Sequence, residues 1–267
     1  VTWVLLGGDV SVIPVRYVRL NAGETAISDQ YYAALDGNWN ADGDGFWGEY
    51  PNDKVDLYAD LFLGRAPVET LAETENFVNK TLEYERGLGE HQNKLLYLGE
   101  RLGAGDGKDY CERVDSQVPQ EGLIKTKLYE SNGNQNRSAA LSAMDEGQNL
   151  IFNVGHSNAY RILMGPPGEA LEYTDMDALS NSGNYSIFCS NKCNTNDISY
   201  DDSFSEHFML NPSGGGIGYI GSTWLDYPSL SIVQNEEFFR LIFQEKGARL
   251  GAAFVNSQLP AIPMIKT

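Results

Sequence analysis

Two long apolar segments in the second half of the chain each end at a chemically reactive side chain. Residues 149–158 place His156 directly after a glycine, and residues 185–196 carry Cys189 and Cys193. β-rich segments of this length, bounded by Gly, Asn and Ser, predict buried strands of a parallel sheet. Because the carboxyl ends of such strands share the edge at which α/β proteins bind ligands, we expect this histidine and a thiol to lie side by side.

Strand and helix patterns alternate around these two segments. Such alternation is typical of βαβ units, and it predicts an α/β fold with a mostly parallel sheet flanked by helices on both faces. Further strands are expected at residues 95–100, 124–130 and 217–223, and helices at 109–118, 137–145, 203–210, 234–244 and 247–259.

The N-terminal part of the chain predicts a smaller α/β unit. A strand-like start is followed by a polar, Gly- and Asn-rich stretch at 21–54, a second strand at 56–67 and a helix at 69–87. The polar stretch is too irregular for a core element and long enough to indicate a functional loop. A polar connection follows the helix, so we expect two consecutive α/β subdomains, residues 1–88 and 89–267.

The acidic composition limits the kinds of molecule that the chain is expected to bind. The formal net charge of −18 disfavours nucleic acid or an anionic membrane, and it is compatible with divalent cations, basic substrates or simple solubility. No segment approaches the roughly 18 consecutive apolar residues of a membrane span. No signal peptide is visible, and we read the sequence as a monomeric catalytic domain of a larger chain. His91, in the polar connection, is expected to be solvated, and no organic cofactor is expected.

Residues 38–49 have the spacing of a calcium-binding loop. Oxygen-bearing side chains alternate at the start, a glycine follows where the chain must turn sharply, and a glutamate that can bind through both oxygens closes the loop. The alternative is a cluster of Asx and Gly turns with incidental acids. We expect structural Ca²⁺ held by Asn38, Asn40, Asp42, Asp44 and Glu49.

The histidine and the cysteines are candidates for nucleophilic catalysis. A cysteine attacks as the thiolate, and a neighbouring imidazole withdraws its proton and later donates one to the leaving group. Cys189 lies within an apolar segment, where thiols are usually inert, whereas Cys193 lies at the polar turn next to Lys192, which would favour the thiolate. Cys193 is therefore the better nucleophile candidate and His156 the candidate base. The alternatives are purely structural roles, or a zinc site that also uses Cys111.

Several segments resemble the catalytic domain of gingipain-type cysteine peptidases, a family of the caspase-like group. Each segment alone is unspecific, but they occur in the family's order and together cover nearly the whole chain. They are VLLGGDVSVIP, ISDQYYAALDGNWNADGDGFWGE, VDLYADLFLGRAPV, NKTLEYERG, NVGHSN, KCNTND and GGIGYIGST.

The resemblance implies a caspase-like fold and a catalytic dyad of His156 and Cys193, the residues that match the family's Gly-His motif and its cysteine turn. It implies an oxyanion hole formed by the main-chain N–H groups of Ser157 and Cys193. Glu100 matches the position of an acid that orients the histidine. The sequence departs from the family at Ser157 and Asn196, where the family carries glycine.

The resemblance also implies substrate-binding residues after the strand at 217–223. Trp224 matches an aromatic wall of the specificity pocket, and Tyr227 is the second match. Asp109 or Asp226 is the candidate acid at the floor of this pocket. Such an acid would select a basic residue before the scissile bond.

Together these features predict a secreted or cell-surface cysteine endopeptidase that hydrolyses protein or peptide substrates through a thioester acyl-enzyme. The alternative from another class is a calcium-stabilised binding domain that keeps the fold and has lost turnover, for which Ser157 and Asn196 are the supporting features. A metal-dependent hydrolase is a third hypothesis.

Overall fold

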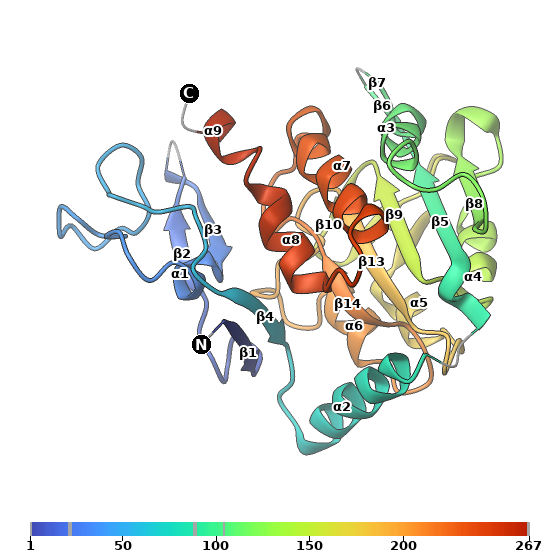
Figure 1. The fold of residues 1–267 in the computed structure, drawn as a ribbon, viewed down its shortest axis with the longest axis horizontal. Coiled ribbons are helices and arrows are strands. Elements are labelled where there is room, and N and C mark those ends of the chain that lie inside the picture. Colours follow the sequence, from blue (N-terminus) through green and yellow to red (C-terminus); the bar gives the residue numbers. More distant parts are fainter. Residues whose placement is uncertain (1, 21–22, 88–89, 104, 266–267) are drawn as a thin grey trace. The chain divides into compact units, whose positions relative to one another are not determined.

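Two compact units make up the chain in the computed structural model (Figure 1). The first comprises residues 1–69 and 233–267, and the second comprises residues 70–232. Within these ranges the structure describes residues 2–20, 23–87, 90–103 and 105–265. The division differs from the expected boundary after residue 88, because the C-terminal segment groups with the N-terminal one and the first long helix groups with the second unit.

The second unit is built on five parallel strands in the order β14–β13–β9–β5–β8. This confirms the predicted parallel sheet. The chain runs from β5 outward to β8 and then crosses to β9 on the other side of β5, so the strand order reverses between β5 and β9. Ligands of such sheets bind at the carboxyl ends of the strands near this reversal. The strands are β5 (Lys94–Gly99), β8 (Ile124–Tyr129), β9 (Leu150–Val154), β13 (Ser186–Asn191) and β14 (Gly216–Ile220).

Helices cover both faces of this sheet, as the sequence predicted. On one face, Ile151 and Phe188 belong to a buried core with Met144 of α4, Met176 of α5 and Phe208 of α6. A fully buried side chain of this size contributes about 1.5–3 kcal/mol. On the other face α3 contacts β5 and β9. These helices are α3 (Gly107–Asp115), α4 (Arg137–Asp145), α5 (Tyr173–Asp177) and α6 (Phe204–Leu210).

The first long helix, α2 (Leu71–Glu85), belongs to the second unit because it packs on β14 and α6. Thr70 and Glu73 form the capping box that begins it. Its Lys80 is buried, and Nζ donates hydrogen bonds to the carbonyl oxygens of Met209, Asn211 and Gly214. A lysine at this position thus satisfies carbonyl groups at the end of α6.

A small antiparallel sheet follows β9 and was not predicted. It consists of β10 (Ser157–Asn158), β11 (Arg161–Leu163) and β12 (Ala170–Glu172) in sequential order. Strands of two or three residues are too short to show a hydrophobic period. This sheet begins directly after His156, so it fixes the path of the chain leaving that residue.

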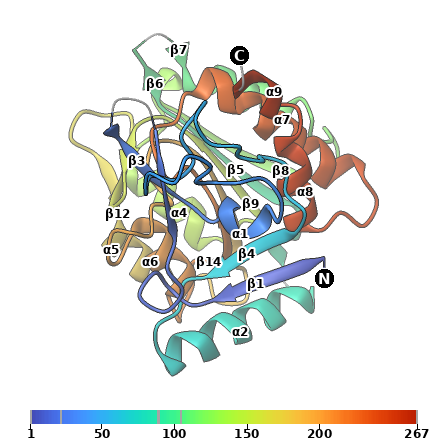
Figure 2. The same ribbon diagram turned by 90° about the vertical axis from the view of Figure 1, so that its left-hand side faces the viewer.

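The first unit contains the parallel pair β1 (Trp3–Gly7) and β4 (Phe62–Ala66), which lie side by side in Figure 2. The polar stretch predicted as a loop also contains regular structure, namely β3 (Thr25–Ser28) and the short helix α1 (Gln30–Ala33). Strand β3 pairs antiparallel with β2 (Arg16–Arg19), which lies just before the stretch. The helix α8 (Leu250–Gln258) packs on β4. The helix α7 (Pro228–Gln244) crosses the boundary between the units, and α9 (Ile262–Ile265) ends the described chain.

The expectation that His91 is solvated was wrong. His91 lies in the short turn Glu90–Asn93, is only 2% exposed, and its Nδ1 lies 3.0 Å from Oδ1 of Asn184. Burial lowers its pKa. A polar sequence context did not reveal that the segment packs against a distant loop. Among the described helices, none combines the length and hydropathy that a membrane crossing requires.

Candidate active site

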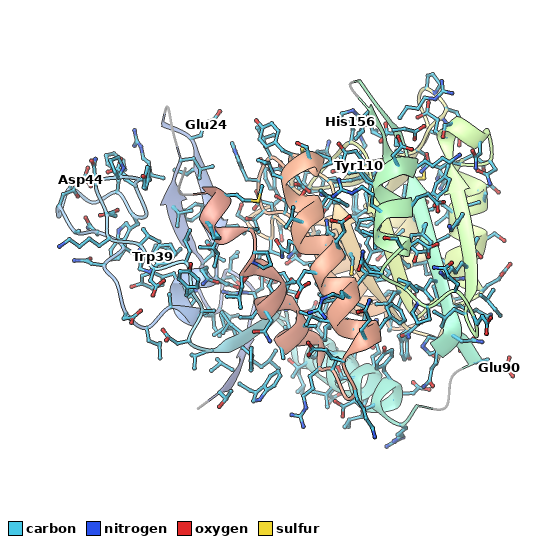
Figure 3. The ribbon with its side chains drawn as sticks, turned by 45° about the horizontal axis from the view of Figure 1, so that its top comes forward. Glu24, Trp39, Asp44, Glu90, Tyr110 and His156 are labelled. Atoms are coloured by element: carbon cyan, nitrogen blue, oxygen red, sulfur yellow. The ribbon has the colours of Figure 1, made fainter. Side chains whose placement is uncertain are left out.

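His156 follows the carboxyl end of β9, and its side chain is exposed (Figure 3). The residue before it must be glycine. A Cβ on Gly155 would clash with Oε2 of Glu100 and would lie 2.7 Å from Nζ of Lys192, and the φ of +156° at this position is rarely adopted by other residues. The Gly-His pair in the sequence therefore reflects a close approach of main chain to two buried charged groups.

Glu100 follows the carboxyl end of the neighbouring strand β5 and is 8% exposed. Its Oε2 accepts a hydrogen bond of 2.7 Å from the main-chain N–H of His156. The expected contact is with the imidazole, but the hydrogen bond in the structure goes to the backbone. Glu100 thus fixes the segment that carries the histidine.

Lys192 is fully buried between these two strand ends. Its Nζ lies 2.9 Å from the carbonyl oxygen of Leu163, 3.4 Å from that of His156 and 3.4 Å from Oε2 of Glu100. Burial lowers the pKa of Lys192 to about 8, and the charge of Glu100 opposes this shift. The sequence suggested that Lys192 favours the Cys193 thiolate, whereas the ammonium group contacts Glu100 and two carbonyl groups.

Cys193 lies in the turn after β13 and is half-buried. Ser157 Oγ donates a hydrogen bond of 2.5 Å to its carbonyl oxygen, which joins the histidine segment to the cysteine segment. Cys189 is 2% exposed, and burial raises the pKa of its thiol. This confirms that Cys189 is a core residue. Cys193 is therefore the accessible thiol at the carboxyl ends of the strands.

The turn that carries Cys193 is held by the segment after β14. Asn194 adopts a left-handed conformation with φ +55°, which asparagine tolerates better than most residues. Its N–H donates to the carbonyl oxygen of Trp224 at 2.9 Å, and the N–H of Asn196 donates to that of Ser222 at 3.0 Å. The left-handed residue of this turn is thus Asn194, and Asn196 retains a main-chain hydrogen bond.

Three of the four candidate substrate-binding residues lie in this same segment. Trp224 is half-buried and Tyr227 is 62% exposed. The carboxylate of Asp226 accepts hydrogen bonds from Asn191 Nδ2 and Ser231 Oγ, and burial raises its pKa. Asp109 is exposed in the first turn of α3. Within the described residues, no hydrogen bond or ion pair joins Asp109 to the other candidates.

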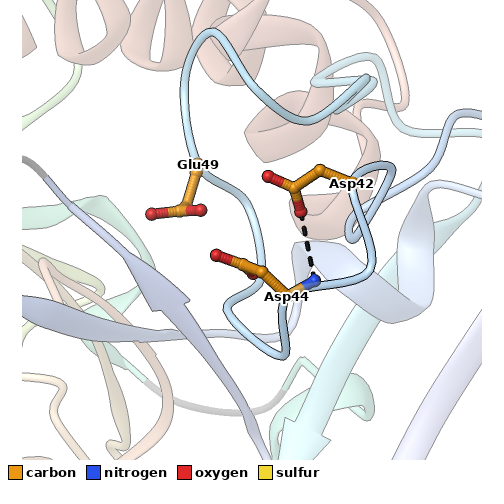
Figure 4. A group of neighbouring side chains, drawn as sticks. All are labelled: Asp42, Asp44 and Glu49. Carbon is orange, nitrogen blue, oxygen red and sulfur yellow. Dashed lines mark hydrogen bonds between the residues drawn. The ribbon is translucent and has the colours of Figure 1, made fainter.

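The candidate calcium ligands meet in the first unit. One carboxylate oxygen each from Asp42, Asp44 and Glu49 lies within 4.8 Å of the others (Figure 4). Asn40 Oδ1 and Glu49 Oε2 are buried without a hydrogen-bond partner among the described residues. The side chain of Asn38 instead accepts the N–H of Asn40 at 3.0 Å. Unsatisfied oxygens beside converging carboxylates fit a hard cation.

Sequence reasoning missed Asp53, which fixes this loop. Asp53 is 7% exposed, and its carboxylate accepts the N–H groups of Ala41 at 2.5 Å and Glu49 at 2.9 Å. It lies beyond the twelve-residue pattern, so the spacing rule did not include it. A carboxylate shared between two loop amides holds the main chain of Glu49 at the cluster.

Comparisons with solved structures show the same fold. The structure of the Arg-specific cysteine proteinase gingipain R superposes with a TM-score of 0.75 at 19% identity, covering 100% of this chain and 60% of that one. The complex of the pro- and mature domains of RgpB from Porphyromonas gingivalis gives a TM-score of 0.73 at 20% identity, covering 100% and 61%. A third structure, described as a protease, gives 0.67 at 17% identity, covering 88% and 48%.

The chain thus spans about three fifths of the length of the first two structures. No match was found among curated protein sequences. The model of peptidase family C25 matches residues 1–264. The chain therefore belongs to peptidase family C25, a family of cysteine peptidases.

Proposed function

We propose that this chain is the catalytic domain of a cysteine endopeptidase with Cys193 as nucleophile and His156 as general acid and base. One observation carries the proposal: Cys193 is the accessible thiol at the end of β13, and Ser157 Oγ ties its carbonyl group to the residue after His156. Family membership supports the same assignment.

In this reaction the Cys193 sulfur forms a bond to the scissile carbonyl carbon while His156 holds the proton of the thiol. The tetrahedral intermediate then breaks the C–N bond, and His156 donates the proton to the leaving amine. Water, deprotonated by His156, attacks the resulting thioester, and the thiol is regenerated when the acid product leaves.

The main-chain N–H groups of Ser157 and Cys193 form the oxyanion hole. Among the described residues, no acceptor is found for the N–H of Cys193, which leaves it available to a substrate oxygen. Loss of one such donor costs about 100- to 1000-fold in rate in other enzymes. Glu100 and Lys192 act by holding the main chain of His156, through its N–H and its carbonyl oxygen respectively.

A basic residue is preferred before the scissile bond. Both oxygens of Asp226 are bonded to the uncharged Asn191 and Ser231, so no cationic side chain neutralises its carboxylate through these contacts. A substrate guanidinium or ammonium group is the natural counter-ion, with Trp224 and Tyr227 as the pocket walls and Asp109 as the other acid. One relative of similar fold is described as Arg-specific.

Structural Ca²⁺ stabilises the loop at 38–49 in the first unit. Asp42, Asp44, Glu49 and Asn40 would hold it, and the unpartnered oxygens of the last two support this set. The ion supplies positive charge that offsets the mutual repulsion of the carboxylates and takes no part in bond cleavage. We further propose secretion or display on the cell surface, where calcium is available to such weak extracellular sites.

Hydrolysis of a peptide library tests the central assignment against the inactive binding domain. The chain should cleave the library, Cys193→Ala should abolish cleavage, and Cys189→Ala should retain it in a folded protein. Absence of cleavage by the unmodified chain would favour the binding domain, and loss of activity only in Cys189→Ala would refute the assignment of Cys193.

A further inference from the structure

The sulfur of Cys193 makes two contacts that the catalytic scheme above does not use. The main-chain N–H of Asp226 donates to Sγ at 3.3 Å, and the carbonyl oxygen of the same residue lies 3.7 Å from Sγ. A neutral thiol can donate its proton to that carbonyl group, whereas a thiolate can only accept. Hydrogen bonds to charged groups are roughly twice as strong as neutral ones. The N–H contact therefore favours the ionised sulfur.

A buried cluster fixes the position of this N–H. Asn191, the last residue of β13, is 1% exposed, and its Nδ2 donates to Asp226 Oδ2 and to Ser231 Oγ. Ser231, in α7, donates to Asp226 Oδ1 at 2.6 Å. Both carboxylate oxygens of Asp226 are thereby anchored, one to the strand that delivers Cys193 and one to a helix. The end of β13 therefore positions both groups: it leads directly to the Cys193 turn, and through Asn191 it holds the residue that carries the Asp226 N–H.

We propose that the main-chain N–H of Asp226 stabilises the thiolate of Cys193, and that Asn191 and Ser231 are positioning residues that hold this N–H on the sulfur. The inference rests on the proposed nucleophile, but it concerns the ionisation of that thiol and not turnover.

The influence of other charged groups on the Cys193 sulfur must be separated from that of the Asp226 N–H. His156 favours the thiolate when its ring is protonated, and the carboxylate of Asp226 opposes it. Glu100 and Lys192 contact each other, so their charges largely offset. The measurement is therefore made in the unmodified chain and repeated in a His156→Ala background, in which the imidazole makes no contribution.

The first experiment is the pH dependence of iodoacetamide alkylation at Cys193, followed by mass spectrometry of the labelled peptide. Ser231→Ala and Asn191→Leu should slow alkylation of Cys193 at mildly acidic pH by about tenfold in both backgrounds, the amount expected for a weakened hydrogen bond to a charged group. Ser229→Ala, an exposed serine of the same helix, is the matched control and should leave the dependence of the rate on pH unchanged. An unchanged dependence in folded Ser231→Ala and Asn191→Leu would overturn the proposal.

A second measurement needs no destabilising variant. In NMR spectra of the unmodified chain, the amide proton of Asp226 should shift with the same midpoint as the alkylation rate, and this titration should disappear in Cys193→Ala. An Asp226 amide that does not respond to ionisation of the thiol would contradict the proposal. Neither experiment uses a substrate, so an inactive but thiol-reactive protein would refute the proposed peptidase activity and leave this inference standing.

Discussion

Nζ of Lys192 lies 3.4 Å from Oε2 of Glu100, and both groups are almost completely removed from water. The same Glu100 oxygen accepts the N–H of His156, and the same ammonium group contacts the carbonyl oxygen of His156. The pair therefore holds the main chain of His156 at two points, its N–H and its carbonyl oxygen. Glu100 follows β5 and Lys192 follows β13, the two strands on either side of β9, so the pair positions the candidate base at the end of β9.

Replacement of Lys192 by Met should destabilise the protein by about 3–5 kcal/mol, because it leaves the buried Glu100 carboxylate without its partner. Chemical denaturation measures the loss. The double variant Lys192→Met with Glu100→Gln should recover part of it, since no buried charge remains. Lys246→Met, at an exposed lysine, should be neutral. Equal losses in the single and double variants would show that the ion pair is not the cause.

Gly155→Ala should strongly lower kcat/KM while the protein stays folded and its melting temperature falls only moderately. The new methyl group would meet Glu100 and Lys192 within van der Waals distance, and overpacking of this kind costs about 1–3 kcal/mol while it shifts the chain at His156. Gly7→Ala is the control, because nothing lies within 4 Å of its Cβ position. Parallel measurement of kcat/KM and the melting temperature separates the loss of activity from the loss of stability. Wild-type activity in Gly155→Ala would contradict the close approach of Gly155 to Glu100 and Lys192.

Chelation of calcium should lower the melting temperature and expose the loop at 38–49 to proteolysis. Burial, followed by the charges of Asp44 and Asp42, raises the pKa of Glu49. Without metal, the contribution of Glu49 to stability is therefore present at low pH and is lost as pH rises through this raised pKa.

Bound calcium requires the ionised carboxylate, so its affinity should fall as pH drops through the same range. Titration calorimetry with Ca²⁺ over a series of decreasing pH values should show this dependence, and Glu49→Gln should weaken binding and flatten it. Glu24→Gln, at an exposed acid, is the control. An unchanged melting temperature after chelation, with no calcium found by elemental analysis, would contradict a calcium site in this loop.

Asp226→Asn should lower kcat/KM for substrates with Arg or Lys before the scissile bond more than for neutral substrates. The reason is that the substitution removes the carboxylate proposed as the counter-ion of the basic substrate side chain. Because any displacement of Cys193 affects both substrate classes, the ratio of the two rates is the informative quantity. Asp109→Asn tests the other acid in the same way. If neither variant changes the ratio, the preference for a basic residue does not come from these carboxylates.

The sequence was sufficient to predict the parallel sheet and the residues at its carboxyl ends. Strands β9 and β13 are buried along their whole length and rich in apolar residues, and His156 and Cys193 each lie two residues beyond a strand end, so the local pattern was enough to place them. The same reasoning separated the buried Cys189 from Cys193. These features depend on the alternation of strand and helix patterns and on the length of the apolar segments, both of which can be recognised in a single sequence.

The rest depends on distant contacts that residue type does not encode. Lys80 is an ordinary helix residue in the sequence, yet its three carbonyl acceptors lie more than a hundred positions away and decide which unit α2 joins. The inward direction of Lys192 follows from the position of Glu100. The contact of the Asp226 amide with Cys193 is a main-chain contact, and any residue other than proline carries that donor.

Covalent labelling by a peptidyl electrophile, with the modified residue located by mass spectrometry, tests the central claim most directly. We expect stoichiometric labelling of Cys193, no labelling of Cys189 or Cys111, and much slower labelling in His156→Ala near neutral pH. Labelling that falls on another residue, or that proceeds at an unchanged rate without His156, would contradict the assignment of these two residues as nucleophile and base.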